Sequence, residues 1–289
     1  MTSLLIEQCQ VAPPPHDGAT ELTLSLTYFD HIWFSFGYIR WILFYKLPIS
    51  KLNFVQTIIP TLKHSLSLTL KHYTPLAGNI ACPLNSSGYP ELRYVTGDSV
   101  FVPFTEIDMD FNHLIKFESK FAIEEETIDD DVMEIFGCVA DCRPRLNPPL
   151  LQSYFGNCLV MIASEASRVD LVGNEGFIIA VEVIGEAIKN QMKDVELILN
   201  CSWYREFCVV DMKRTLTIAG SPKFNLYDVD FGWGRPEKIE IISIDNSIGI
   251  SMSISKYKDS DGDLEVGLSL PKTRMSVFAA IFDHRLSFL

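Results

Sequence analysis

The spacing of apolar residues predicts long helices in both halves of the chain. After Ser50, a suitable N-cap residue, apolar side chains recur with a helical period as far as Tyr73. Pro60 lies early enough in this helix to be tolerated, and the segment PLAGN that follows ends it. A second helix is predicted over 170–193. Its apolar face would consist of Phe177, Ile178, Val181, Ile184, Ile188 and Met192.

Shorter runs with the pattern of strands surround these helices. They cover residues 22–28, 91–95, 99–104, 134–146, 153–166, 214–219, 238–244, 250–257 and 264–270. Gly97 and Asp98 mark a turn between two of these runs, and 259–263 predicts a hairpin turn. A last helix is predicted over 271–284, beginning at a proline. The mixture of strands and helices predicts an α/β protein.

An acidic segment divides the chain. Glu118–Glu134 contains eight acidic residues against one lysine and has no clean apolar period, which is typical of a solvated linker. A metal or partner site built from these carboxylates is the alternative. We therefore predict an N-terminal part over 1–114, a junction over 115–133 and a C-terminal part over 134–289.

Composition excludes several classes of protein. With 289 residues, 47% of them hydrophobic and 11% aromatic, the chain can build a core and is not disordered. Its formal net charge of −13 and its lack of a lysine- and arginine-rich run exclude a nucleic-acid partner. The most apolar stretch, Ile32–Leu47, is too short for a membrane span and contains Arg40. Because the first residues do not have the pattern of a secretory signal, we expect a cytoplasmic protein without a membrane partner.

The cysteines and the acidic turn do not indicate a metal site. The seven cysteines form no CxxC pair and are odd in number, which favours buried free thiols over disulfides or zinc. Counted from Asp259, the sixth and twelfth positions hold Leu264 and Leu270, whereas a calcium-binding EF-hand needs glycine and glutamate there. We expect no metal.

Two short motifs are far more specific. The sequence DFGWG at Asp230–Gly234, followed by Arg-Pro, resembles the signature of the plant BAHD acyltransferases, which move acyl groups from coenzyme A thioesters to hydroxyls or amines. The sequence YFGNC at Tyr154–Cys158 and the preceding ADCRPRLNPPL resemble the subgroup that acylates anthocyanins and phenolic glucosides, often with malonyl-CoA. VAPPP near the start, PLAGN and DSDGDLEVGLSL near the end resemble the same subgroup.

The resemblance implies a chloramphenicol-acetyltransferase-like fold of two α/β domains with the acyl site in a channel between them. It implies acyl-CoA, in particular malonyl-CoA, as co-substrate without a bound cofactor. The acceptor would be a phenolic or flavonoid glucoside, and the protein would be a monomer.

One expected motif is missing. In BAHD enzymes the catalytic base is the histidine of an HxxxD motif, but none of the six histidines here has an aspartate four positions later. Family members are also much longer, and the missing sequence would fall between about Leu114 and Glu118. We predict an internally truncated fold whose uncovered apolar surfaces and strand edges promote association.

Two arginines and the YFGNC segment are the candidate donor-binding residues. The guanidinium groups of Arg143 and Arg145 could pair with the malonyl carboxylate or the phosphates of coenzyme A. The alternative is a strand whose arginines reach solvent or the linker carboxylates. The segment contributes Tyr154, Phe155, Gly156, Asn157 and Cys158 to the same candidate set, and its alternative is a core strand without ligand contact.

Asp230 and His113 are the remaining candidates for catalysis. An ordinary carboxylate is a poor base for a hydroxyl, so Asp230 is a weak candidate, and the glycines of the Asp230, Phe231, Gly232, Trp233 and Gly234 motif favour a tight structural turn. A lone histidine beside an apolar residue, such as His113, is more often a surface or core residue. We therefore predict a catalytically impaired O-acyltransferase. The alternatives are a non-catalytic binder of acyl-CoA or glucoside, and an incomplete gene model of an active malonyltransferase.

Overall fold

The contacts between residues divide the chain into two units, which are described separately. One consists of Met1–His31 and Lys46–Lys116, and the other of Ile32–Tyr45 and Phe117–Leu289. The structure, a computed structural model, describes residues 2–15, 21–35, 38–82, 89–115, 132–193, 214–220, 222–242, 250–260, 262–270 and 272–286. Among the helices within these ranges, none combines the length and the apolar character required to cross a membrane.

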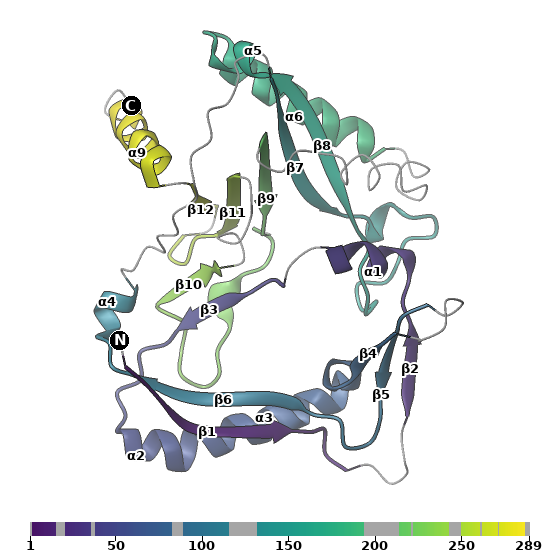
Figure 1. Cartoon of the computed structure of the whole chain (residues 1–289), viewed down its shortest axis with the longest axis vertical. Coiled ribbons are helices and arrows are strands. Elements are labelled where there is room, and N and C mark those ends of the chain that lie inside the picture. Colours follow the sequence, from purple (N-terminus) through teal and green to yellow (C-terminus); the bar gives the residue numbers. More distant parts are fainter. Residues whose placement is uncertain are drawn as a thin grey trace. The chain divides into compact units, whose positions relative to one another are not determined.

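The first unit contains two antiparallel sheets and one long helix (Figure 1). One sheet pairs β1 (Ser3–Val11) with β6 (Val100–Ile107). The other places β5 (Glu91–Tyr94) between β2 (Leu22–Ser25) and β4 (Asn79–Ala81). The short helices α1 (Tyr28–Ile32) and α4 (Phe111–Ile115) follow β2 and β6 in the sequence.

The helix predicted after Ser50 is confirmed and contains one wider turn. The Ser50 side chain accepts a hydrogen bond from the backbone N–H of Asn53, at 3.2 Å, as an N-cap should. The helix consists of α2 (Lys51–Asn53), a π-helical turn (Phe54–Ile58) and α3 (Ile59–His72). Since Pro60 has no N–H and its ring crowds the preceding turn, the wider π turn directly before it gives the ring room.

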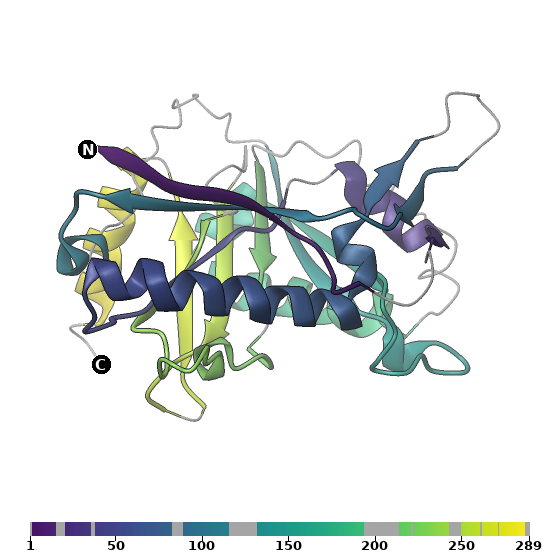
Figure 2. The ribbon, with the colours of Figure 1, turned by 90° about the horizontal axis from the view of Figure 1, so that it is seen from below.

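A small apolar core holds the first unit together. Figure 2 shows α3 running along the β1–β6 pair, and Lys63 of the helix donates to the Glu7 carboxylate of β1 at 2.6 Å. The buried side chains of this core come from β1, α3, the turn after it and β5. They are Val11, Leu70, Ala77 and Tyr94. This core therefore joins both sheets to the helix.

The second unit is built on a five-stranded mixed sheet. Its strand order is β12 (Leu264–Ser269), β11 (Ile250–Lys256), β9 (Thr215–Ala219), β7 (Met133–Asp141) and β8 (Leu159–Ser167). The three inner strands are parallel, and each edge strand is antiparallel to its neighbour. The helices are α5 (Arg168–Val172), α6 (Gly176–Gln191), which packs on β8, and α9 (Lys272–Leu286).

A strand from the first fifty residues belongs to this second unit. β3 (Trp41–Phe44) pairs antiparallel with β10 (Lys238–Ile241), and the Glu237 N–H donates to the Phe44 carbonyl at 2.7 Å. The predicted division at 114 and 134 assigns β3 to the N-terminal part. Pairing between strands almost two hundred residues apart leaves no local signal in either one.

Three predicted elements are corrected by the structure. The strand predicted over 134–146 ends at Asp141, and Arg143–Arg145 forms a 3-10 turn. The strand predicted over 153–166 begins only at Leu159, so the YFGNC motif lies in a loop. The helix predicted over 170–193 is broken after α5, and the break brings Gly176 so close to Leu171 that a side chain at position 176 would collide with the Leu171 carbonyl. The acidic segment falls almost wholly outside the described residues.

Four of the six residues of the predicted apolar face of α6 are exposed, whereas Ile184 is half-buried and Met192 is buried. Phe177 is 82% exposed, and Ile178, Val181 and Ile188 are exposed as well. The helix contacts β8, and its Gln191 side chain exchanges two hydrogen bonds with the backbone of Ala163. An apolar face of this kind is typical of a helix that is covered by another layer, and no such layer is present in the described part of this unit.

This exposure predicts very different costs for two apolar truncations. Ile162→Ala on β8, where the side chain is 1% exposed, should lower the free energy of unfolding by about 2–5 kcal/mol. Phe177→Ala on α6 should change it by less than about 0.5 kcal/mol, because the ring is already in solvent. Urea unfolding followed by circular dichroism measures both. Equal losses would show that another layer covers α6.

Candidate functional site

The candidate site lies at one end of the β7–β8 pair. The two strands are paired over nine residues, from Met133 opposite Ser167 to Asp141 opposite Leu159. The pairing continues one step further, since the Cys142 N–H donates to the Cys158 carbonyl at 2.9 Å. The 3-10 turn after β7 and the YFGNC loop before β8 are therefore brought side by side.

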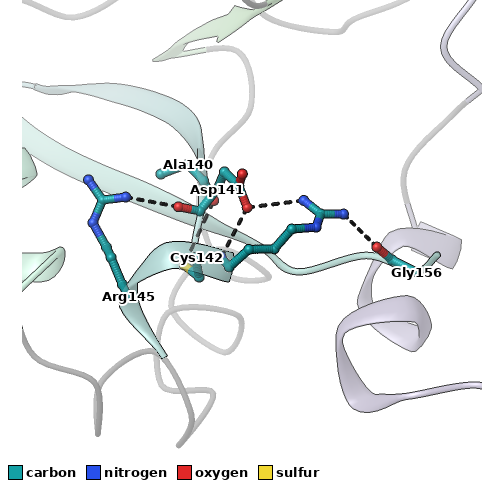
Figure 3. Close-up of polar contacts among 6 residues, drawn as sticks. Ala140, Asp141, Cys142, Arg145 and Gly156 are labelled. Carbon is teal, nitrogen blue, oxygen red and sulfur yellow. Dashed lines mark hydrogen bonds and ion pairs between the residues drawn. The ribbon is translucent and has the colours of Figure 1, made fainter. Parts of the chain in front are cut away.

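Arg143 links that turn to the loop. Its Nη1 donates to Asp141 Oδ1 at 3.0 Å and its Nη2 donates to the Gly156 carbonyl at 2.7 Å (Figure 3). The backbone N–H of Arg143 donates to the same Asp141 oxygen at 3.0 Å. Bonds between a guanidinium and a carboxylate are stronger than neutral hydrogen bonds. The side chain thus joins the end of β7 to the centre of the YFGNC motif.

Arg145 makes a different contact from the same turn. Its Nη1 donates to the Asp141 backbone carbonyl at 2.9 Å, and the residue is exposed. Figure 3 shows Asp141 between Arg145 on one side and Gly156 on the other. Both arginines therefore belong to a turn, and neither stands on a strand as the sequence pattern indicated.

The YFGNC loop is folded tightly around its glycine. A β-carbon on Gly156 would come within 2.8 Å of the Tyr154 hydroxyl oxygen and 2.9 Å of its ring carbons. The Tyr154 ring thus lies directly against the Gly156 backbone, and a side chain at position 156 would have to displace it. Phe155 projects outward and is half exposed, whereas Cys158 is fully buried.

The two cysteines that pair just beyond the ends of β7 and β8 are neutral thiols. Cys142 and Cys158 are both fully buried. Burial, with a smaller effect of the Cys158 sulfur, raises the pKa of Cys142 to about 12. Burial also raises the pKa of Cys158, against a lowering effect of Arg143. Since the thiolate is the reactive form, these cysteines are not suited to nucleophilic catalysis.

The DFGWG motif forms a separate turn organised by Asp230. One oxygen, Asp230 Oδ1, accepts hydrogen bonds from the backbone N–H groups of Gly232, Trp233 and Gly234, at 2.7, 2.8 and 2.9 Å. Gly232 and Gly234 have φ angles of 87° and 83°, which favour glycine. The Asp230 carboxylate therefore serves as the acceptor that closes this turn.

Tyr45, next to β3, holds the aromatic side of this turn. Its ring packs edge-on against Phe231 and Trp233, with centroid distances of 5.7 and 5.5 Å, and its hydroxyl donates to the Val229 carbonyl at 2.8 Å. Burial and then the charge of Asp230 raise the pKa of Tyr45. Edge-on aromatic pairs contribute about 0.5–1.5 kcal/mol each beyond the area they bury.

Sequence patterns did not identify two residues of these turns, Asp141 and Tyr45. Asp141 lies within ADCRPRL, and its position two residues before an arginine is a signal that could have found it. Tyr45 lies far from the motif in sequence and has no such signal. His113 is in α4 of the first unit, where its backbone N–H donates to the Asp110 carboxylate at 3.0 Å. Among the described residues there is no group of three His, Cys, Asp or Glu side chains that could hold a metal.

Comparison with known proteins shows similarity along nearly the whole chain. A family model described as the Transferase family matches residues 6–110 and 117–285. The chain is 42% identical to phenolic glucoside malonyltransferase 1 of Nicotiana tabacum, in an alignment covering 99% of both chains. It is 27% identical to a malonyl-coenzyme:anthocyanin 5-O-glucoside-6'''-O-malonyltransferase of Salvia splendens, covering 97% of this chain and 95% of the other.

A solved structure supports the fold. The crystal structure of vinorine synthase matches with a TM-score of 0.59 and 14% identity, over 95% of this chain and 96% of that one. The alignment with the Nicotiana tabacum protein extends over 451 positions, although this chain has 289 residues.

Asp230→Ala should destabilise the DFGWG turn. Removing the acceptor of three N–H groups at an exposed turn should lower the free energy of unfolding by about 1 kcal/mol, and Trp233 emission should shift to the red as its packing loosens. Asp230→Asn keeps one acceptor oxygen and should cost less. Denaturant unfolding and tryptophan fluorescence measure both effects, and an Asp230→Ala protein as stable as the parent would contradict the structural role.

The buried Cys142 thiol predicts a loss of stability at alkaline pH. The pKa of Cys142 is raised from 9.0 to about 12 in the folded chain, so the unfolded chain loses its proton first as the pH rises. The free energy of unfolding should fall between pH 9 and pH 12 and be unaffected by this group below pH 8. Cys142→Ala should make the fall shallower by about 1 kcal/mol per pH unit. Urea unfolding at pH 8, 9, 10 and 11 gives the free energy of unfolding of both proteins. The same fall with pH in Cys142→Ala as in the parent would contradict this prediction.

Proposed function

This chain belongs to the BAHD acyltransferases, the family described by its transferase model, and we propose on that premise that it binds malonyl-CoA and a phenolic or flavonoid glucoside. The family reaction transfers the acyl group from the thioester to a hydroxyl of the acceptor. We further propose that transfer by this chain is impaired, because it lacks an HxxxD motif.

The observation that carries the proposal is the 42% identity with a phenolic glucoside malonyltransferase over 99% of both chains. A second relative, named for malonyl transfer to an anthocyanin glucoside, supports the same donor and the same class of acceptor. Both names join an acyl-CoA donor to a glycosylated phenolic compound. The YFGNC and DFGWG motifs are intact and folded.

The geometry of the arginine turn supports binding of an anionic donor. Arg145 brings an exposed guanidinium group to this turn, whereas the guanidinium of Arg143 is held by Asp141 and the Gly156 carbonyl. Guanidinium groups suit both the malonyl carboxylate and the phosphates of coenzyme A. We assign the donor-binding role to this turn and to the loop of Tyr154–Cys158.

Impaired transfer follows from the missing base. A positioned general base contributes about 10²–10⁴ in rate, because it removes the proton of the attacking hydroxyl. Asp230 is engaged with three N–H groups, and Cys142 and Cys158 are neutral. The aligned length of 451 positions against 289 residues, and the break in the family match at 111–116, support loss of an internal segment that includes the base.

A paired assay tests the proposal. Transfer from malonyl-CoA to a panel of phenolic and flavonoid glucosides should be lower than that of the Nicotiana tabacum relative by at least about 10²-fold, while calorimetry detects malonyl-CoA binding. The relative serves as the positive control in both measurements. Transfer at its rate would contradict the impairment, and absence of binding would contradict the donor assignment.

The transcript distinguishes a shortened protein from an incomplete gene model. We expect sequencing across codons 114–134 in the source tissue to find the short product, with its junction peptide present in extracts. A longer product alone, restoring an HxxxD segment, would instead identify this chain as an incomplete version of an ordinary acyltransferase.

A further inference from the structure

We propose that the two arginines of the turn have different roles: Arg143 positions the YFGNC loop, and Arg145 meets an anionic group of the acyl donor. The first role concerns the folded chain alone. The second rests on the proposed function, since it requires that the chain bind acyl-CoA. The two roles are argued and tested separately.

The hydrogen bonds of Arg143 fix the loop at several points. Its guanidinium bridges Asp141 Oδ1 and the Gly156 carbonyl, and its own backbone carbonyl accepts from the Leu150 N–H at 2.9 Å. One residue thereby holds both the outgoing and the returning limb of the loop at the end of β7. The side chain is 24% exposed, so these bonds are partly shielded from water. With both terminal nitrogens engaged, Arg143 is poorly placed to bind a ligand as well.

The bond from Arg143 to the Gly156 carbonyl also affects two neighbouring residues of the loop, Tyr154 and Cys158. The Tyr154 ring lies against Gly156, and two residues further along the chain Cys158 is fully buried where the loop enters β8. A loop released from Arg143 would therefore free the tyrosine ring and open the path to the Cys158 thiol. This makes Cys158 an internal reporter of the loop position that does not depend on any ligand.

Arg145, unlike Arg143, has side-chain nitrogens available to bind a ligand. It is exposed, the one hydrogen bond that its side chain makes among the described residues goes to a neutral backbone carbonyl, and none of their carboxylates forms an ion pair with it. The nearby Asp141 carboxylate is occupied by Arg143. Arg145 therefore retains Nη2 and Nε for a planar, two-point contact with a carboxylate or phosphate.

Cysteine alkylation tests the role of Arg143. Iodoacetamide labelling of the Cys158 peptide, followed by mass spectrometry, should become on the order of tenfold faster in Arg143→Ala, because two charge-assisted bonds are lost. Arg143→Lys keeps the charge but has a single nitrogen that cannot bridge both acceptors, so it should also be labelled faster. Circular dichroism verifies that the variants are folded.

Arg168→Ala is the matched control for that experiment. Arg168 is 29% exposed and pairs with Glu134 at the opposite end of the same β7–β8 pair, at 3.5 Å. Its loss should leave Cys158 labelling unchanged. Labelling of Arg143→Ala or Arg143→Lys at the parental rate, or equal acceleration in Arg168→Ala, would overturn the positioning role.

Calorimetric titration with malonyl-CoA, acetyl-CoA and coenzyme A tests the role of Arg145. Arg145→Gln should weaken malonyl-CoA binding by about fivefold, a modest effect that suits an exposed charge. If malonyl-CoA alone is affected, the group recognised is the malonyl carboxylate; if all three are affected alike, it is a phosphate. Either result supports the assignment. Unchanged affinities would overturn it.

The experiments distinguish failure of the role proposed for Arg143 from failure of the role proposed for Arg145. If the parent chain binds none of the three compounds, the proposed function and the Arg145 assignment fall together, while Cys158 labelling still decides the role of Arg143. If the parent binds malonyl-CoA and Arg145→Gln binds it equally well, the proposed function stands and only the Arg145 assignment is wrong.

Discussion

The register of β7 against β8 is the constraint on which the candidate site depends. Nine residue pairs set it, and the Cys142 and Cys158 backbones extend it to the point where both strands leave the sheet. A slip of one residue would turn every side chain of one strand to the other face and separate Arg143 from Gly156. Burial of Met161, Ile162 and Cys158 opposes such a slip, because their side chains would have to be repacked. The position of the site is thus a consequence of core packing in the sheet.

The DFGWG turn depends on a different, long-range constraint. Asp230 closes the turn locally, but its aromatic side chains pack on Tyr45, and the adjoining β3 pairs with β10. The turn is therefore held from within by one carboxylate oxygen and from outside by a segment almost two hundred residues away in sequence. This double support explains how an exposed turn with two glycines at positive φ keeps one conformation.

Patterns in the sequence predicted elements well where the physical cause is local. The N-cap at Ser50 and the helix stop at PLAGN are interactions between near neighbours, and both are confirmed. The start of β8 at Leu159 was misplaced because apolar residues of the YFGNC loop continue the strand pattern without belonging to the strand. The end of β7 at Asp141 was misplaced because the residues after it form a 3-10 turn. The arginines were correctly placed near the motif, but the Arg143 bond to Gly156 depends on tertiary pairing. Tyr45 and β3 were missed for the same reason.

The exposed face of α6 connects the fold to the proposed loss of activity. Phe177, Ile178 and Val181 have the spacing of a buried face and lie in solvent in the described unit, as expected when a covering layer is lost. The arginine turn does not need that layer, because the described side-chain hydrogen bonds of its two arginines go to residues 141 and 156. A chain that lost an internal segment would therefore lose cover and general base together while retaining the residues assigned to the donor. Donor binding and acyl transfer are separable in such a protein, since the first requires only the local turn and the second is accelerated by a positioned general base.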